Sequence, residues 1–231
     1  MIRESTGTIR LFSFDFWDTL VASNPSFALA RNALVYEQLG CEAHDIAVDT
    51  FTAYFNTAKQ KTERQSEREG RHIGLAERLG VLCVSLNLPA PSDKIVAAIE
   101  NEQHALSATF PAHLYSEGVP ALLQSIADSG RAIGVISNTG MLNSQDVMKL
   151  IEINSLDNLI THHVFSDQTG FTKPNSRAFY TLTEFAGVAP ETVLHTGDNK
   201  FADYEGARAN GMYAVHASLD KVGIAQVEEY L

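Results

Sequence analysis

Residues 9–20 read IRLFSFDFWDTL and begin the fold. Residues 9–14 form a short apolar run, which predicts a strand that is buried on both faces. The run stops at Asp15, so an acidic side chain follows directly after the strand. Ligands of open α/β sheets bind at the carboxyl ends of the strands. Asp15 is therefore the first candidate functional residue.

Outward from this strand, the chain divides into a helical stretch and an alternating stretch. Four helices are expected first, at 26–40, 45–69, 72–87 and 92–109. From residue 117 onward strands and helices alternate, with strands at 132–137, 161–166, 193–196 and 213–216 and helices at 119–129, 145–153, 176–186 and 202–210. Alternation predicts a parallel sheet covered on both faces, which is a three-layer α/β core. We expect this core domain at 1–20 and 116–231, with an inserted α-helical cap domain at 21–115.

Composition and charge restrict the partners. The chain has 231 residues, of which 45% are hydrophobic, enough for one sizeable core or for a core and a smaller lobe. It carries 17 basic and 28 acidic residues, a net charge of −11. This balance argues against nucleic acid, which is bound through clusters of Lys and Arg. Any phosphate site must be made locally positive by a metal ion, a lysine or backbone N–H groups.

Targeting signals are missing from the sequence. No apolar run has membrane-spanning length, and residues 1–10 lack the pattern of a secretory signal. Cys41 and Cys83 show no metal-ligand spacing, and we interpret them as reduced thiols. We therefore expect a cytoplasmic protein without a membrane partner. A homodimer is compatible with the sequence.

Reactive side chains recur at the carboxyl ends of the expected strands. They are Asp15, Thr19, Ser137, Asn138, Lys173, Asp198 and Asp203. Parallel strands end at one edge of a sheet, so we expect these groups to lie close together. Converging carboxylates repel each other, and a hard cation with oxygen ligands relieves that repulsion. Octahedral Mg²⁺ fits best.

These groups suit phosphoryl transfer, which needs mainly positioning and charge stabilisation. A metal ion and Lys173 would neutralise the phosphoryl group. The carboxylate of Asp15 would attack and form an aspartyl-phosphate, which divides hydrolysis into two easier steps. The hydroxyls of Thr19 and Ser137 would bind phosphoryl oxygens. The sequence thus predicts a magnesium-dependent phosphohydrolase that acts on a small phosphate ester.

The four segments FDFWDTL, VISN, TKPNSRAF and HTGDNKFADYEGARANGM together resemble the haloacid dehalogenase (HAD)-like hydrolase superfamily. The helical stretch resembles the small cap of its type I members. The resemblance implies a Rossmann-like core in which Asp15 is the nucleophile. Ser137 then belongs to the second motif and Lys173 to the third.

The resemblance also implies a metal site and a substrate site. The metal would be held by Asp15, by the backbone carbonyl of Trp17 and by the acids of the fourth motif, Asp198 and Asp203. The expected substrate-binding residues are Trp17, Thr19, Ser137, Asn138 and Lys173.

One position departs from the family pattern. Phosphatases of the family usually carry a second Asp two residues after the nucleophile, which protonates the leaving group and then activates water. Here that residue is Trp17, and Asp18 replaces the usual glycine. Loss of such an acid costs roughly 10²–10⁴ in rate. Asp18, His72 or Lys59 could replace it, or the substrate could have a good leaving group.

Three other functions remain open. A metal-free 2-haloacid dehalogenase also has an aromatic residue two places after the nucleophile, although Gly197-Asp198 with Asp203 favours magnesium and phosphate. A phosphonate hydrolase would need a cap lysine as a Schiff base, for which Lys59 and Lys61 are available. A slow or non-catalytic ligand-binding protein would keep the site without the acid.

Overall fold

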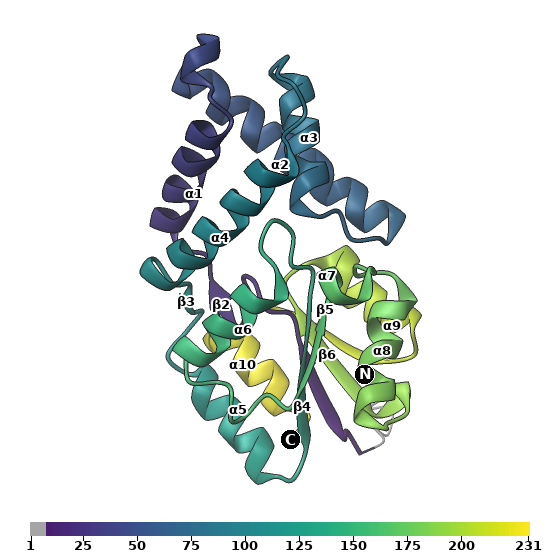
Figure 1. The fold of residues 1–231 in the computed structure, drawn as a ribbon. Helices are drawn as coiled ribbons and strands as arrows, with labels where there is room; N and C mark the ends of the chain where they lie inside the picture. The colour runs from purple at the N-terminus through teal and green to yellow at the C-terminus, as the bar shows by residue number, and fades with distance from the viewer. Residues whose placement is uncertain (1–7) are drawn as a thin grey trace.

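The computed structural model describes residues 8–231, and its centre is a five-stranded parallel sheet in the order β5-β4-β1-β6-β7 (Figure 1). The strands are β1 (Leu11–Phe14), β4 (Ala132–Ser137), β5 (His162–Phe165), β6 (Val193–Gly197) and β7 (Tyr213–His216). β1 lies in the middle, with Leu11 opposite Ala132 of β4 and opposite Val193 of β6. The first functional candidate therefore follows the central strand.

Helices cover both faces of the sheet, which confirms the predicted three-layer core. One face packs against α5 (Val119–Asp128), α6 (Ser144–Ile153) and α10 (Lys221–Glu228). The other face packs against α8 (Ser176–Ala186) and α9 (Gly206–Ala209). Successive side chains of a strand point to opposite faces, so Phe12 and Phe14 pack on the first layer and Leu11 on the second.

Four helices gather at one end of the molecule (Figure 1). They are α1 (Pro25–Gln38), α2 (Val48–Glu69), α3 (Leu75–Ser85) and α4 (Asp93–Thr109), and we call residues 25–109 the helical region and the remainder the sheet region. The helical region has a hydrophobic cluster of its own. The buried residues of α2 share one face at helical spacing: Phe51, Phe55, Ala58, Thr62 and Ser66.

A short antiparallel pair joins the two regions. β2 (Val21–Ala22) pairs with β3 (His113–Leu114), so the chain enters and leaves the helical region at one place. The sequence did not predict this pair, because each strand has two residues and the pairing joins distant segments. It also did not predict α10 or the short helix α7 (Ser166–Thr169).

The helix expected at 202–210 is divided. A wide π-helical turn covers Lys200–Glu205, and α9 follows it. The side chain of Asn199 caps the turn by accepting from the N–H groups of Phe201 and Ala202, both at 3.0 Å. The wide turn brings Asp203 back beside its own strand β6.

No helix among residues 8–231 is long and apolar enough to cross a membrane. Cys41 and Cys83 are both free and buried. We expected no secretory signal in residues 1–10. Residues 1–7 of this stretch lie outside the described residues.

Candidate functional site

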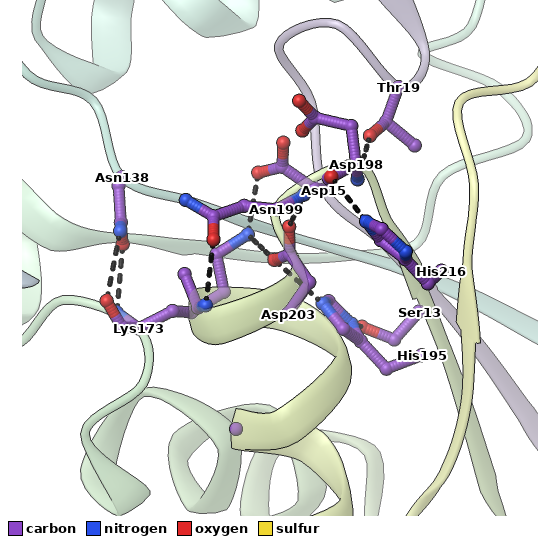
Figure 2. Close-up of polar contacts among 12 residues, drawn as sticks. Ser13, Asp15, Thr19, Asn138, Lys173, His195, Asp198, Asn199, Asp203 and His216 are labelled. Atoms are coloured by element: carbon purple, nitrogen blue, oxygen red, sulfur yellow. Dashed lines mark hydrogen bonds and ion pairs between the residues drawn. The ribbon is translucent and has the colours of Figure 1, made fainter.

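The carboxyl edge of the sheet gathers the predicted acids around one lysine (Figure 2). Lys173 Nζ lies 2.5 Å from Asp15 Oδ1 and 2.6 Å from Asp203 Oδ1. One carboxylate oxygen from each of Asp15, Asp198 and Asp203 lies within 4.8 Å of the others. Residues far apart in the sequence thus form a single cluster of charges.

The loop after β1 fixes the position of Asp15. The N–H of Asp15 donates to the carbonyl of Thr196 at 2.9 Å, which continues the pairing of β1 with β6. The chain then turns at Asp18, whose φ is +54° and whose N–H donates to Val21 at 2.7 Å. This left-handed conformation explains why a glycine is usual here, and Asp tolerates it better than most residues.

Thr19 and His216 hold the backbone of Asp198. The N–H of Asp198 donates to Thr19 Oγ1 at 3.1 Å, and His216 Nε2 lies 2.8 Å from the carbonyl of Asp198. The hydroxyl oxygen of Thr19 therefore positions the acid, while its O–H remains a donor. The carboxylate of Asp198 is exposed and free to meet a ligand.

Asn138 clamps the segment that contains Lys173. Its Oδ1 accepts from the backbone N–H of Lys173 at 2.8 Å, and its Nδ2 donates to the carbonyl of the same residue at 3.1 Å. Both polar atoms of the side chain are thus engaged. The geometry gives Asn138 a positioning role for Lys173, and the residue also lines the cavity, so its direct contact with substrate stays a prediction.

His195 belongs to the site, although the sequence reasoning did not select it. Its Nε2 lies 3.2 Å from Asp203 Oδ1 and its Nδ1 lies 2.8 Å from Ser13 Oγ. The ring thus donates to Asp203 and accepts from Ser13. Ser13 and His195 lie opposite each other on adjacent strands. Two polar residues inside apolar strands were a signal that could have identified them.

Asp203 uses both of its carboxylate oxygens within the protein. Oδ1 accepts from Lys173 and His195, and Oδ2 accepts from the N–H of Asn199 at 3.1 Å. Asp15 and Asp198 are therefore better placed than Asp203 to offer oxygen atoms to a cation.

The electrostatics of the cluster favour a bound cation. Burial, together with the charges of Asp203 and Asp198, raises the pKa of Asp15 to about 7 against the opposing effect of Lys173. Partial desolvation and the neighbouring Asp203 raise the pKa of Asp198 as well. Burial disfavours the charge of Lys173, but Asp15 and Asp203 outweigh it and raise the lysine pKa. One ammonium does not balance three carboxylates, and hard oxygen donors suit Mg²⁺.

Ser137 offers a buried hydroxyl at the end of β4. The residue is 1% exposed, and its Oγ has no hydrogen-bond partner among residues 8–231. A buried hydroxyl without a partner is costly, so Ser137 Oγ is available as a donor at this edge of the sheet.

A cavity of about 400 Å³ lies between the site and the helical region. Trp17 and Asp18 line it from the sheet region, and Trp17 packs edge-on against Phe16 with ring centroids 5.1 Å apart. The helical region contributes aromatic and charged side chains, among them Phe27, Arg31, Lys59, Glu63 and Glu67, and Phe110 follows directly after it.

The structure separates the three proton donors that the sequence suggested. Asp18 and Lys59 line the cavity, but Lys59 pairs with Glu63 at 3.7 Å. His72 does not line it, and its Nδ1 lies 3.0 Å from Ser166 Oγ. Glu67, which also lines the cavity, was not among the expected residues.

Comparisons with known proteins agree with this geometry. The family model for haloacid dehalogenase-like hydrolases matches residues 13–217. Glyceraldehyde 3-phosphate phosphatase from Methanopyrus kandleri is 29% identical over 210 residues, which cover 90% of this chain and 83% of that protein. The haloacid dehalogenase-like hydrolase domain-containing protein 3 of Bos taurus is 31% identical over 99 residues, which span 42% of this chain and 38% of the bovine protein.

Solved structures share the fold. A HAD phosphatase from Thermococcus onnurineus has a TM-score of 0.66 at 18% identity, covering 92% of this chain and 88% of that chain. YfnB of Bacillus subtilis, a predicted HAD-hydrolase bound to magnesium, has a TM-score of 0.65 at 21% identity, covering 94% and 97%. Since the family model covers most of its length, this chain belongs to the haloacid dehalogenase-like hydrolases.

Proposed function

We propose that this hydrolase is a magnesium-dependent phosphatase of small phosphate esters. The observation that carries the proposal is the cluster of Asp15, Asp198 and Asp203 around Lys173, beside the unpartnered hydroxyl of Ser137. Acids, a cation and a buried donor at one sheet edge match what a phosphoryl group and its metal require.

Asp15 and Asp198, with the backbone carbonyl of Trp17, would hold the magnesium ion. When bound, the ion supplies charge neutralisation for the phosphoryl oxygens and keeps Asp15 ionised. The magnesium-bound relative supports this choice of metal.

The chain's own residues then perform the first step. The free carboxylate oxygen of Asp15 attacks phosphorus in line with the leaving oxygen, and an aspartyl-phosphate forms. The ammonium of Lys173 and the hydroxyls of Ser137 and Thr19 stabilise the charge that develops on the phosphoryl oxygens. In the second step water attacks phosphorus, releases phosphate and restores Asp15.

The cavity supports a small leaving group. Arg31 projects from α1 with its guanidinium 5.7 Å from the ring centre of Phe27 and 5.3 Å from that of Phe55. Its Nε is buried and has no hydrogen-bond partner among the described residues. A carboxylate or another oxygen acceptor on the leaving group would satisfy this donor.

Two similar proteins are named as phosphatases, one from Methanopyrus kandleri and one from Mycobacterium tuberculosis. We propose that residues 21–115 act as a cap that closes over the substrate and excludes water. The two free thiols fit a reducing compartment, so we place the enzyme in the cytoplasm.

The test is hydrolysis of a panel of phosphate esters with Mg²⁺ and with EDTA. We expect turnover that EDTA abolishes and Mg²⁺ restores, and a phospho-enzyme that acid quenching traps in the wild type but not in Asp15→Asn. Chloride release from 2-chloropropionate that EDTA leaves unchanged would instead indicate a metal-free dehalogenase. Ligand binding without turnover of any ester would indicate a non-catalytic protein.

A further inference from the structure

The leaving-group side of the site has a tryptophan where an acid is expected, and the helical region supplies a carboxyl group nearby. Glu67 lies in the last turns of α2, and its Oε1 accepts from Asn199 Nδ2 at 2.9 Å. Asn199 directly follows Asp198, one of the two acids best placed for the metal. The contact thus joins the helical region to the reaction centre.

Glu67 also lines the cavity, which Trp17 and Asp18 line from the sheet region. A leaving group in this cavity would have the aromatic ring of Trp17 on one side and the carboxyl of Glu67 on another. The residue is half-buried, which leaves it reachable by a ligand while partly desolvated.

The surroundings of Glu67 favour its protonated form. Burial, followed by the charges of Glu63 and Asp203, raises its pKa, against the opposing effects of the Asn199 hydrogen bond and of Lys173. The other charged groups that line the cavity are Asp18, Arg31 and Lys59. A carboxylic acid with a raised pKa holds its proton closer to neutral pH, as a general acid requires.

We propose that Glu67 is the general acid–base of this enzyme and takes the place of the carboxylate that Trp17 replaces. The proposal rests on the phosphatase function proposed above. In this role the carboxyl group of Glu67, a residue of the helical region, contacts the substrate.

As Asp15 bonds to phosphorus and the bond from phosphorus to the leaving oxygen breaks, the carboxyl of Glu67 gives its proton to that oxygen and an alcohol departs. The carboxylate of Glu67 then takes a proton from water as the water oxygen bonds to phosphorus. The bond from phosphorus to Asp15 breaks, phosphate leaves, and both side chains return to their starting states.

The competing explanation is a latch, in which Glu67 only holds the helical region against Asn199. A general acid matters for poor leaving groups and little for good ones, whereas a latch matters for both. The experiment therefore compares Glu67→Gln with the wild type on an alkyl phosphate and on p-nitrophenyl phosphate, both with saturating Mg²⁺.

We expect Glu67→Gln to lower kcat on the alkyl ester by about 10²–10⁴ and on p-nitrophenyl phosphate by less than about tenfold. The matched control is Glu63→Gln, which removes a carboxylate one turn earlier in the same cavity. Because the charge of Glu63 also acts on the pKa of Glu67, a second control is Glu69→Gln, an exposed carboxylate at the end of the same helix that does not line the cavity. Glu69→Gln should leave the ratio of the two rates unchanged. Equal losses on both esters in Glu67→Gln would overturn the proposal.

The pH profile gives an independent readout. With the alkyl ester, wild-type kcat should fall as pH rises through the raised pKa of Glu67, because the acid then loses its proton. This limb should be absent from Glu67→Gln, and its persistence there would contradict the assignment.

Two further variants separate the acid from the latch. Asn199→Ser keeps a capping oxygen for the turn but removes the amide donor to Glu67. Since the glutamine of Glu67→Gln can still accept from Asn199, a latch predicts losses on both esters in Asn199→Ser and little loss in Glu67→Gln, whereas an acid predicts the larger loss on the alkyl ester in Glu67→Gln. Adding Trp17→Asp to Glu67→Gln should restore at least about tenfold on the alkyl ester, because it returns a carboxyl to the leaving-group side. A folded double variant without recovery would count against the proposal.

Failure of the two proposals can be distinguished. A wild type that hydrolyses neither ester defeats the phosphatase assignment and, with it, Glu67. A wild type that hydrolyses both, with an unchanged rate ratio in Glu67→Gln, defeats Glu67 alone. Trapping of the phospho-enzyme from p-nitrophenyl phosphate in Glu67→Gln would show that the variant is folded and still attacks phosphorus.

Discussion

The sheet region and the helical region handle charge in opposite ways. At the sheet edge, Asp15, Lys173 and Asp203 are buried and bonded to one another. In the helical region, Arg71 pairs with Glu69 and Glu77, and all three side chains are at least 33% exposed. Buried partners lock each other in place, while exposed ones are solvated and contribute little. The difference suggests a fixed reaction centre beneath a more adaptable substrate surface.

The two regions also have separate hydrophobic clusters. The helical cluster takes a single residue, Met141, from the sheet region. Met141 belongs to the loop after β4, next to Gly140 with φ of +69°. The regions thus meet through loops, through α4 against α6, and through polar contacts such as that of Glu67 with Asn199. The contrast predicts that sheet-region variants impair every substrate alike, whereas cavity variants discriminate among substrates.

The largest effect should come from Asp15→Asn. We expect turnover to drop at least about 10⁴-fold on every ester, because the amide cannot form the aspartyl-phosphate. The fold should persist, since Lys173 keeps its pairing with Asp203. Kinetics and circular dichroism would check this. The control is Asp18→Asn, an acid three residues later, and equal losses in both variants would show that Asp15 is not the nucleophile.

Lys173→Met should be the next largest change. It leaves the carboxylates of Asp15 and Asp203 buried without their cation, which costs about 3–5 kcal/mol of unfolding free energy. Urea unfolding at neutral pH in EDTA would measure the loss, and added Mg²⁺ should recover part of it. Arg71→Met removes an exposed cation that also has two acidic partners, and it should scarcely change the stability. Similar losses in both variants would remove the contrast between the regions.

His195→Leu should act through Asp203. The substitution removes the donor that orients Asp203 and, through it, Lys173, so we expect kcat to fall about 10–100-fold on both good and poor leaving groups. KM should change little, because His195 does not face the cavity. His195→Gln, which retains a donor, should recover part of the rate. The control is His163→Leu, in the edge strand β5. An equal loss of kcat in this variant would indicate general destabilisation.

Arg31→Met should give the smallest effect and the most selective one. We expect KM to rise about tenfold, or about 1.4 kcal/mol, for esters whose leaving group carries a carboxylate. The value for phenyl phosphate should stay unchanged, because its leaving group carries no further oxygen acceptor for the guanidinium. Steady-state kinetics on the two kinds of ester would test this. An equal rise in KM for both kinds of ester would mean that Arg31 maintains the shape of the cavity and does not bind the leaving group.

Local patterns were sufficient for much of the fold. A short apolar run predicted β1, the alternation of strands and helices included β6, and helical spacing with a closing Gly187 predicted α8 with its bounds unchanged. Boundaries shifted where the backbone leaves the helical conformation, as at Asp45, whose φ of +54° delays the start of α2 to Val48, three residues later than expected. The wide turn at Lys200–Glu205 was not predictable from periodicity, because Asn199 and its tertiary surroundings determine it.

The candidate site was only partly predictable. Asp15, Lys173, Asp198 and Asp203 were identified from strand ends and motif order. The residues that contact them were not identified. Ser13 and His195 join the network through a cross-strand pairing of residues that lie far apart in the sequence.

The sequence by itself determined which side chains follow the strands, since a strand's end is a local property of hydrophobic pattern and turn residues. It also determined that Trp17 occupies the place of the usual acid. Only the tertiary structure decided which groups face one another across regions. The approach of Glu67 to Asn199 depends on how α2 lies over the sheet, and packing between distant segments leaves no mark in local periodicity.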